Sequence, residues 1–174
     1  MKWINPEGYD CVKDIEKSSW WKAIYHLKLD RNNPLILEDD DGTQYRTSWE
    51  YWTDMGSVPR FPPIAQCVVP KDRFLSFFPH DQCYEFGTIW KRRPYADLDG
   101  KIAYTPWMEY DVTREFADDL LYRGALCDPI KPWKITAYIV WKQVRLWGKG
   151  NFNQRTVLPP PPPPRAMKYP VALA

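Results

Sequence analysis

Six consecutive prolines constrain this chain more than any other feature of its sequence. They are Pro159, Pro160, Pro161, Pro162, Pro163 and Pro164. Proline has a fixed φ and no backbone N–H, so this segment cannot join a helix or a sheet and is expected to be extended polyproline II. We therefore divide the 174 residues into a single domain, residues 1–150, and an extended Pro-rich tail, residues 151–174. Polyproline segments bind aromatic-lined grooves, so we expect the tail to dock on a neighbouring chain.

The composition narrows the functional classes. The net charge of +2 gives no reason to expect a nucleic-acid partner. No apolar stretch is long enough for a membrane span, and the first residues do not read as a signal peptide. The four cysteines are scattered without a C-x-x-C pair, which argues against a structural zinc site and favours free thiols in a reducing cytoplasm. The aromatic share of 16% suits extensive protein interfaces or a small core of large side chains.

Strand signals dominate the first third of the chain. Residues 23–29 alternate between apolar and polar side chains, as a half-buried strand does. The runs 35–37 and 44–47 flank an Asp-Asp-Asp-Gly turn, and Asp-Gly between two such runs predicts a hairpin. Residues 49–53 form another candidate strand, whereas residues 1–20 look irregular. The pattern predicts a small N-terminal antiparallel sheet.

Helix signals follow the sheet. Residues 71–86 are a candidate helix that Pro79 kinks or interrupts. A capping Thr and a terminal Gly predict a helix over 113–124, and a first-turn Pro with a closing Gly predicts one over 132–148. Residues 87–110 look like an inserted loop. We therefore expect an α+β fold, in which the sheet is followed by about three helices.

The apolar stripes of these helices predict the core. The residues expected to be buried are Phe74, Phe77, Phe78, Ala117, Leu121, Val140 and Val144. If most of them proved exposed, the helix phases would be wrong.

Three short blocks combine polar side chains with apolar surroundings: T-D-M-G-S at residues 53–57, H-D-Q-C-Y at residues 80–84 and R-E-F-A-D at residues 114–118. Helical spacing places the first and last residues of the second block on one helix face. Buried polar groups need partners, so the three blocks are expected to meet. The residues expected to converge are His80, Asp118, Asp54 and Arg114, with a His80 ring nitrogen roughly 2.6–3.2 Å from the Asp118 carboxylate.

In this order, the three blocks resemble a family of short, functionally uncharacterised proteins of tailed bacteriophages and prophages. The pattern of that family reads T-D-G-A-S-[IV]-P, H-D-x-x-Y and R-x-x-A-D, and its final V-R-x-[FW]-G is matched by residues 144–148. The chain departs from the pattern at Met55-Gly56, which moves the backbone freedom of glycine by one residue. The resemblance implies a virion component, tail-associated and made in the host cytoplasm, which docks to other virion proteins through aromatic surfaces and its tail.

The second block is also similar to the H-D-x-C-Y helix of phospholipases A2. That resemblance implies that His80 is the general base for a water and that Asp118, from an antiparallel helix, orients it. It also implies that Asp81 binds Ca²⁺ with oxygen atoms of the loop from Asp54 to Ser57. No other cofactor is expected. The alternative function is therefore an envelope-degrading hydrolase that cleaves a phospholipid or peptidoglycan bond with a His80/Asp118 dyad.

A purely structural interpretation stays open beside the catalytic one. The same side chains can form a buried network that fastens the loop to two helices, with the arginine as a clamp on a carboxylate. The supporting members of this network are Asp54, Ser57, Asp81, Tyr84 and Arg114. Ser57 is not expected to be a nucleophile, because it lacks the strand–turn–helix setting of G-x-S-x-G.

Overall fold

The computed structural model describes residues 1–18, 24–53, 75–129, 134–148 and 152. The proline tail, Phe74, Asp54 and Ser57 lie outside the described residues, and the predictions about them stay predictions.

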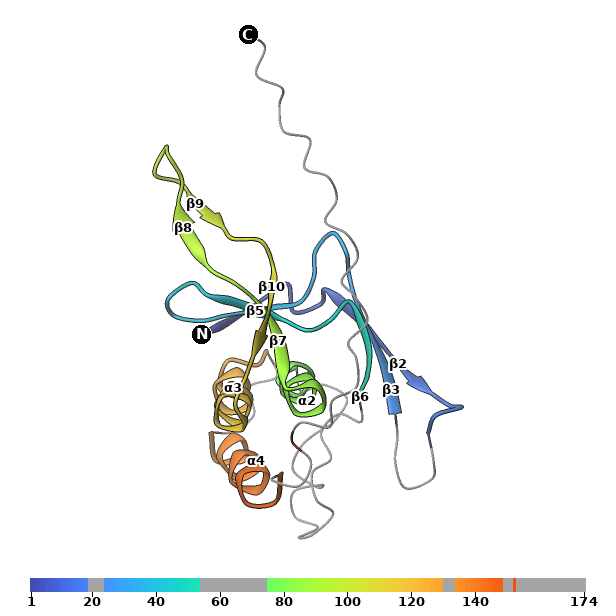
Figure 1. Cartoon of the computed structure of the whole chain (residues 1–174). Helices are drawn as coiled ribbons and strands as arrows, with labels where there is room; N and C mark the ends of the chain where they lie inside the picture. Colours follow the sequence, from blue (N-terminus) through green and yellow to red (C-terminus); the bar gives the residue numbers. More distant parts are fainter. Residues whose placement is uncertain (19–23, 54–74, 130–133, 149–151, 153–174) are drawn as a thin grey trace.

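The fold is α+β, as predicted, with two main antiparallel sheets (Figure 1). The larger sheet has the order β1 (Lys2–Ile4), β4 (Ile36–Glu38), β5 (Gln44–Arg46), β7 (Thr88–Arg92) and β10 (Met108–Asp111). The smaller one has the order β2 (Tyr9–Asp14), β3 (Ile24–Leu29) and β6 (Glu50–Thr53). The strands predicted at 23–29 and 49–53 and the hairpin around the Asp-rich turn are confirmed. The prediction that residues 1–20 are irregular is wrong, because β2 pairs with β3 along its whole length.

The prediction of an inserted loop over residues 87–110 is also wrong. These residues form a long hairpin, in which β7 continues into β8 (Pro94–Ala96) and β9 (Ile102–Tyr104) continues into β10. Two residues on one strand, 92–93, face three residues on the other, 105–107. The one extra residue on the second strand forms a β-bulge, which bends the hairpin. We call the part beyond the bulge, residues 94–104, the arm; it projects from the body (Figure 1).

The tip of the arm is a pre-ordered turn. The side chain of Asp97 accepts hydrogen bonds from the backbone N–H groups of Asp99 (3.0 Å) and Lys101 (2.8 Å). Gly100 adopts φ +74°, a conformation that favours glycine. Between them Leu98 is 106% exposed. The sequence signal for this hairpin was Asp99-Gly100, but its flanking strands are too short and too interrupted by proline to show clear alternation.

Two helices, α2 (Phe77–Phe86) and α3 (Arg114–Leu126), pack on one face of the larger sheet, and α4 (Lys134–Trp147) packs on α3, farther from the sheet (Figure 1). Pro79 does not break α2, because it lies in the first turn, where backbone N–H groups have no helical acceptor. Thr113 caps α3 as predicted, with its hydroxyl accepting from the N–H of Phe116. Gly124 does not end α3. It allows close packing instead, since a Cβ there would lie 3.0 Å from Cβ of Ser76.

The core has two parts, and α2 lies between them. Phe77 and Cys83 pack with α3, α4 and the larger sheet, whereas Phe78 packs with Leu27 and Tyr51 of the smaller sheet. This position explains why α2 carries large apolar side chains on more than one face. The core prediction is confirmed within the described residues, because its members there are all buried: Phe77, Phe78, Ala117, Leu121, Val140 and Val144.

The outer face of the larger sheet, away from the helices, carries a group of stacked arginine and aromatic side chains. Its guanidinium groups alternate with aromatic rings: Arg92 stacks on Tyr104 (4.6 Å to the ring centroid) and Trp107 (4.5 Å). Arg46 stacks on Trp107 (4.8 Å) and Trp49 (4.2 Å). We call these five residues the ladder. Tyr104 is the last residue of the arm and Trp107 lies in the bulge, so the ladder connects the arm to the sheet.

Candidate functional site

Two antiparallel helices position the candidate site. The start of α2 packs on the end of α3, where Ser76 meets Gly124, and the end of α2 meets the start of α3, where Tyr84 contacts Arg114 and Asp118. Helical spacing places His80 one turn before Tyr84, and their rings are in contact with centroids 4.3 Å apart. The two motif blocks therefore meet at the α2–α3 interface, as expected.

His80 lies between two carboxylates. Its Nδ1 is 3.2 Å from Oδ1 of Asp81, and its Nε2 is 3.7 Å from Oδ1 of Asp118. The second distance exceeds the predicted hydrogen-bond range, and Nε2 has no hydrogen-bond partner among the described residues. His80 is 4% exposed. Burial disfavours a charged ring, but Asp118 and Asp81 outweigh it and raise the pKa of His80, so the ring keeps its proton to a higher pH than an ordinary histidine does.

Asp118 is the fully buried centre of the cluster. Its Oδ1 accepts a hydrogen bond of 2.5 Å from the Tyr84 hydroxyl, and its Oδ2 accepts one of 3.1 Å from Nη1 of Arg145. Nε of Arg114 lies 3.7 Å from Oδ2. Burial alone would raise the pKa of Asp118, but the interactions with His80, Tyr84 and Arg145 lower it. Asp118 is therefore an anion at neutral pH. Burial and the hydrogen bond to the Asp118 carboxylate together raise the pKa of Tyr84.

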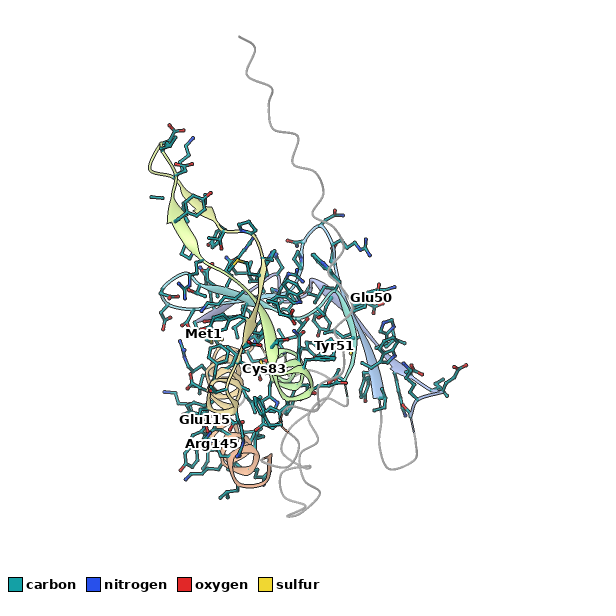
Figure 2. All side chains as sticks on the ribbon, viewed as in Figure 1. Met1, Glu50, Tyr51, Cys83, Glu115 and Arg145 are labelled. Atoms are coloured by element: carbon teal, nitrogen blue, oxygen red, sulfur yellow. The ribbon has the colours of Figure 1, made fainter. Side chains whose placement is uncertain are left out.

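The C-terminal end of α4 completes the cluster. Arg114 donates to the backbone carbonyls of Val144 (3.1 Å) and Arg145, which holds the end of α4 against α3. Arg145 then reaches both Asp118 and Glu115, the latter at 3.4 Å (Figure 2). Gly148 fits closely against Tyr84, since a Cβ there would lie 2.6 Å from the Tyr84 hydroxyl oxygen. Arg145 and Gly148 are both in the V-R-x-W-G block, for which the sequence predicted only that Gly148 closes the helix and gave Arg145 no role.

Asp81 points toward the smaller sheet. Its Oδ2 accepts a hydrogen bond from the hydroxyl of Thr53, the last residue of β6. Calcium requires six to eight oxygen ligands, and here one carboxylate and one hydroxyl meet. Within the described residues no group of three acidic, His or Cys side chains is arranged to hold a metal ion. The described residues alone do not form a calcium site, and the predicted loop ligands lie outside them.

The structure therefore brings together His80, Asp118, Tyr84 and Arg114, with Asp81 beside His80.

The three described cysteines, Cys11, Cys83 and Cys127, are free, as expected, and burial raises the pKa of the Cys83 thiol. Within the described residues no helix is both long and apolar enough to cross a membrane.

Comparison of the chain with protein-family models, with curated proteins and with solved structures finds no match. The motif resemblances to phage proteins and to phospholipases A2 therefore enter the functional argument only as proposals.

Proposed function

We propose that this chain is a bacteriophage virion component that hydrolyses a bond of the bacterial cell envelope, a phospholipid or a peptidoglycan bond. The virion part of the proposal rests on the motif resemblance, and the hydrolase part on the arrangement of His80 and Asp118 on antiparallel helices, with the carboxylate fixed by Tyr84 and Arg145. A base needs a partner that holds its ring, and a buried, multiply bonded carboxylate is suited to that role.

In this proposal Asp118 orients the ring by charge attraction from the Nε2 side, at 3.7 Å, and Nδ1 takes a proton from the attacking water. The imidazolium must first lose its Nδ1 proton, and Asp81, which now faces Nδ1 at 3.2 Å, must turn aside. Because the neighbouring carboxylates raise the pKa of His80, the rate is expected to rise with pH as the ring becomes neutral. Calcium, if bound, would take oxygen ligands including Asp81; no step is derived through it.

The test is hydrolysis of phosphatidylethanolamine–phosphatidylglycerol vesicles, followed by fatty-acid release, and of purified peptidoglycan, followed by new reducing ends and amines. Wild-type protein is expected to cleave one of them, and His80→Gln to lose about 10²–10⁴-fold of the rate. The matched control is His26→Gln, since His26 is the other histidine and stacks on Trp52 in the smaller sheet. Each assay is run with calcium and with a chelator. If wild-type protein cleaves neither substrate, or His80→Gln cleaves as fast as wild type, the hydrolase proposal fails.

A second function, docking within the virion without catalysis, is favoured by the arm. Its large side chains Tyr95, Leu98 and Ile102 are exposed on a ribbon that projects from the body (Figure 1). A two-stranded ribbon is marginally stable alone, so exposed apolar side chains on it favour a partner that covers them.

Leu98→Asp tests the docking function, because Leu98 lies at the tip and contributes little to the core. A phage that encodes this variant is expected to incorporate less of the protein into purified particles, as quantified by mass spectrometry, while the melting temperature of the purified protein stays unchanged. Ala103→Asp is not a suitable control because Ala103 pairs with Tyr95 inside the arm. The exposed Glu16→Lys, in the turn after β2, is the control outside the arm. Equal incorporation of the Leu98→Asp and wild-type proteins would contradict a docking role for the arm.

A further inference from the structure

The surface of α4 that is turned away from α3 carries large apolar side chains. Ile135 is 62% exposed, Tyr138 46% and Leu146 67%. Together with Lys142 they follow one another at helical spacing, which places all four on one stripe of the helix. The opposite stripe is buried against α3 and the core, so the packing of the domain does not account for this one. We call Ile135, Tyr138, Lys142 and Leu146 the α4 stripe.

The charge of α4 has a single sign. Its sequence contains Lys134, Lys142 and Arg145 and no Asp or Glu. Arg145 turns to α3, where it pairs with Glu115 and Asp118. Both lysines are exposed, and neither forms an ion pair with another described residue. The surface around the α4 stripe therefore presents positive charge that is not paired within the described part of the chain.

Aromatic rings join the apolar and the charged parts of this surface. The rings of Tyr138 and Trp141 are in contact, with centroids 5.7 Å apart, and Trp141 also contacts Tyr122 of α3 at 5.8 Å. Nζ of Lys142 lies 5.7 Å from both the Tyr138 and the Trp141 centroid. Tyrosine, tryptophan and lysine each have an apolar body and a polar end. Such side chains suit a boundary between an apolar phase and a charged one, as in the headgroup layer of a membrane.

A partner for the α4 stripe has to be apolar and anionic at once. A second copy of the chain does not meet this requirement, because a two-fold contact through the stripe would bring the lysines of both copies together. A bilayer with anionic lipids does meet it, since its phosphates lie at the surface and its acyl chains directly below. Isolated apolar side chains are common on protein surfaces, but here they share one stripe with cations and without anions.

We propose that the α4 stripe docks the protein on the surface of a bilayer that contains anionic phospholipids. In this arrangement α4 lies in the plane of the headgroups, Ile135 and Leu146 enter the acyl boundary, and Lys134 and Lys142 contact phosphates. Figure 1 shows α4 at the end of the body opposite the arm, so docking there leaves the arm uncovered. The inference goes beyond the proposed function, because binding to a bilayer requires no hydrolysis.

The experiment is co-sedimentation of the full-length chain with sucrose-loaded vesicles of ether-linked lipids, whose chains an esterase cannot release. One set is pure phosphatidylcholine, and the other contains equal parts of phosphatidylcholine and phosphatidylglycerol. Wild-type protein is expected to bind the anionic vesicles about tenfold or more tightly than the neutral ones, since each lysine near an anionic surface favours binding severalfold. Higher salt is expected to weaken this binding. Equal affinity for the two sets, or binding to neither, overturns the inference.

Substitution of the apolar residues tests whether the α4 stripe makes the contact. The double variant Ile135→Gln/Leu146→Gln is expected to lower the affinity for anionic vesicles about tenfold or more, because two side chains no longer enter the acyl boundary. Ile15→Gln is the matched control, since Ile15 is 84% exposed in the turn after β2, in another part of the molecule. It is expected to bind as wild type does. Unchanged affinity in the double variant contradicts the inference, as does an equal loss in Ile15→Gln.

Lys142→Gln tests the charge, and it keeps the test usable if the double variant does not fold, because Lys142 is exposed. Its affinity is expected to fall about threefold to fivefold for anionic vesicles and to stay unchanged for neutral ones. Lys13→Gln, which removes an exposed lysine of β2, is the control. An equal loss in Lys13→Gln would mean that net charge, not the α4 stripe, attracts the vesicles, and would overturn the inference.

Sedimentation velocity without lipid tests the competing occupant. A wild-type dimer that the double variant Ile135→Gln/Leu146→Gln dissociates would assign the α4 stripe to a second copy and overturn the inference. The proposed function fails or stands separately. A protein that binds anionic vesicles and hydrolyses nothing would reject the proposed function and leave the docking surface standing, and hydrolysis of dispersed substrate by a protein that does not bind vesicles would do the reverse.

Discussion

The cluster around Asp118 and the ladder around Arg46 both bury positive charge, and they do so in opposite ways. In the cluster, His80, Arg114 and Arg145 surround a carboxylate, so each cation faces an anion. In the ladder, Arg46 is 3% exposed and has no carboxylate partner among the described residues; it stacks on indole rings and donates one hydrogen bond, to the carbonyl of Thr47. Burial and the like charge of Arg92 lower the pKa of Arg46 to about 10.

This difference determines what each arrangement leaves behind when one member is lost. Removing the anion from the cluster leaves the buried ring of His80, two partly exposed guanidinium groups and the Tyr84 hydroxyl without their common acceptor, and loss of one partner of a buried ion pair is strongly destabilising. Removing the cation from the ladder leaves ring faces, which are apolar and need no partner. The cluster is therefore expected to be intolerant of substitution and the ladder tolerant.

The largest effect is expected for Asp118→Leu, which keeps the branched shape of the side chain and removes the charge. His80, Arg145 and Tyr84 lose their common acceptor, and the free energy of unfolding is expected to fall by about 3–5 kcal/mol. Urea unfolding followed by circular dichroism measures it. Asp119→Leu, one residue along the same helix and 58% exposed, is the control, with an expected change within about 0.5 kcal/mol. Similar losses in the two variants would mean that Asp118 is not the centre of the cluster.

The sequence allowed much of the cluster to be predicted. His80, Tyr84 and Asp118 lie on helices with clear signals, and buried polar side chains on two packed helices must find each other. Arg145 was missed for a physical reason: an arginine on an amphipathic helix ordinarily points to solvent, and no local pattern shows that this one reaches a carboxylate on another helix. The closest available signal was its place in the V-R-x-W-G block.

The ladder was not predictable in the same way. Its members lie on β5, after β5, on β7, on β9 and in the bulge. They become neighbours only through strand register, which pairs Arg46 with Trp90 and Gln44 with Arg92. Register across strands separated by a helix is a tertiary property. The arm was missed with it, since strands of three residues on both sides of a turn give too short a pattern to separate from a loop.

A smaller effect is expected for Arg46→Met, which tests the tolerant half of the comparison. Arg46 stacks on Trp49 and Trp107 of the ladder and also lies 5.3 Å from the ring centroid of Trp90. Each cation–π contact stabilises Arg46 by about 0.5–2 kcal/mol, and the desolvation of the guanidinium opposes that gain. Methionine fills irregular apolar space and contacts rings favourably through its sulfur. The two terms nearly cancel, so the free energy of unfolding is expected to change by less than about 1 kcal/mol in either direction.

Urea unfolding under the conditions used for Asp118→Leu measures this change, and the two variants are compared directly. Arg46→Glu is the contrasting variant: it places a carboxylate among the ring faces, beside Arg92, and buries a charge that stacking does not stabilise, so it is expected to be clearly less stable than Arg46→Met. A decrease of about 3 kcal/mol or more in the free energy of unfolding of Arg46→Met would contradict the comparison, because a decrease of that size is typical of a broken buried ion pair. It would mean that Arg46 is paired with a negative charge in solution and that both halves of the molecule bury cations by the same means.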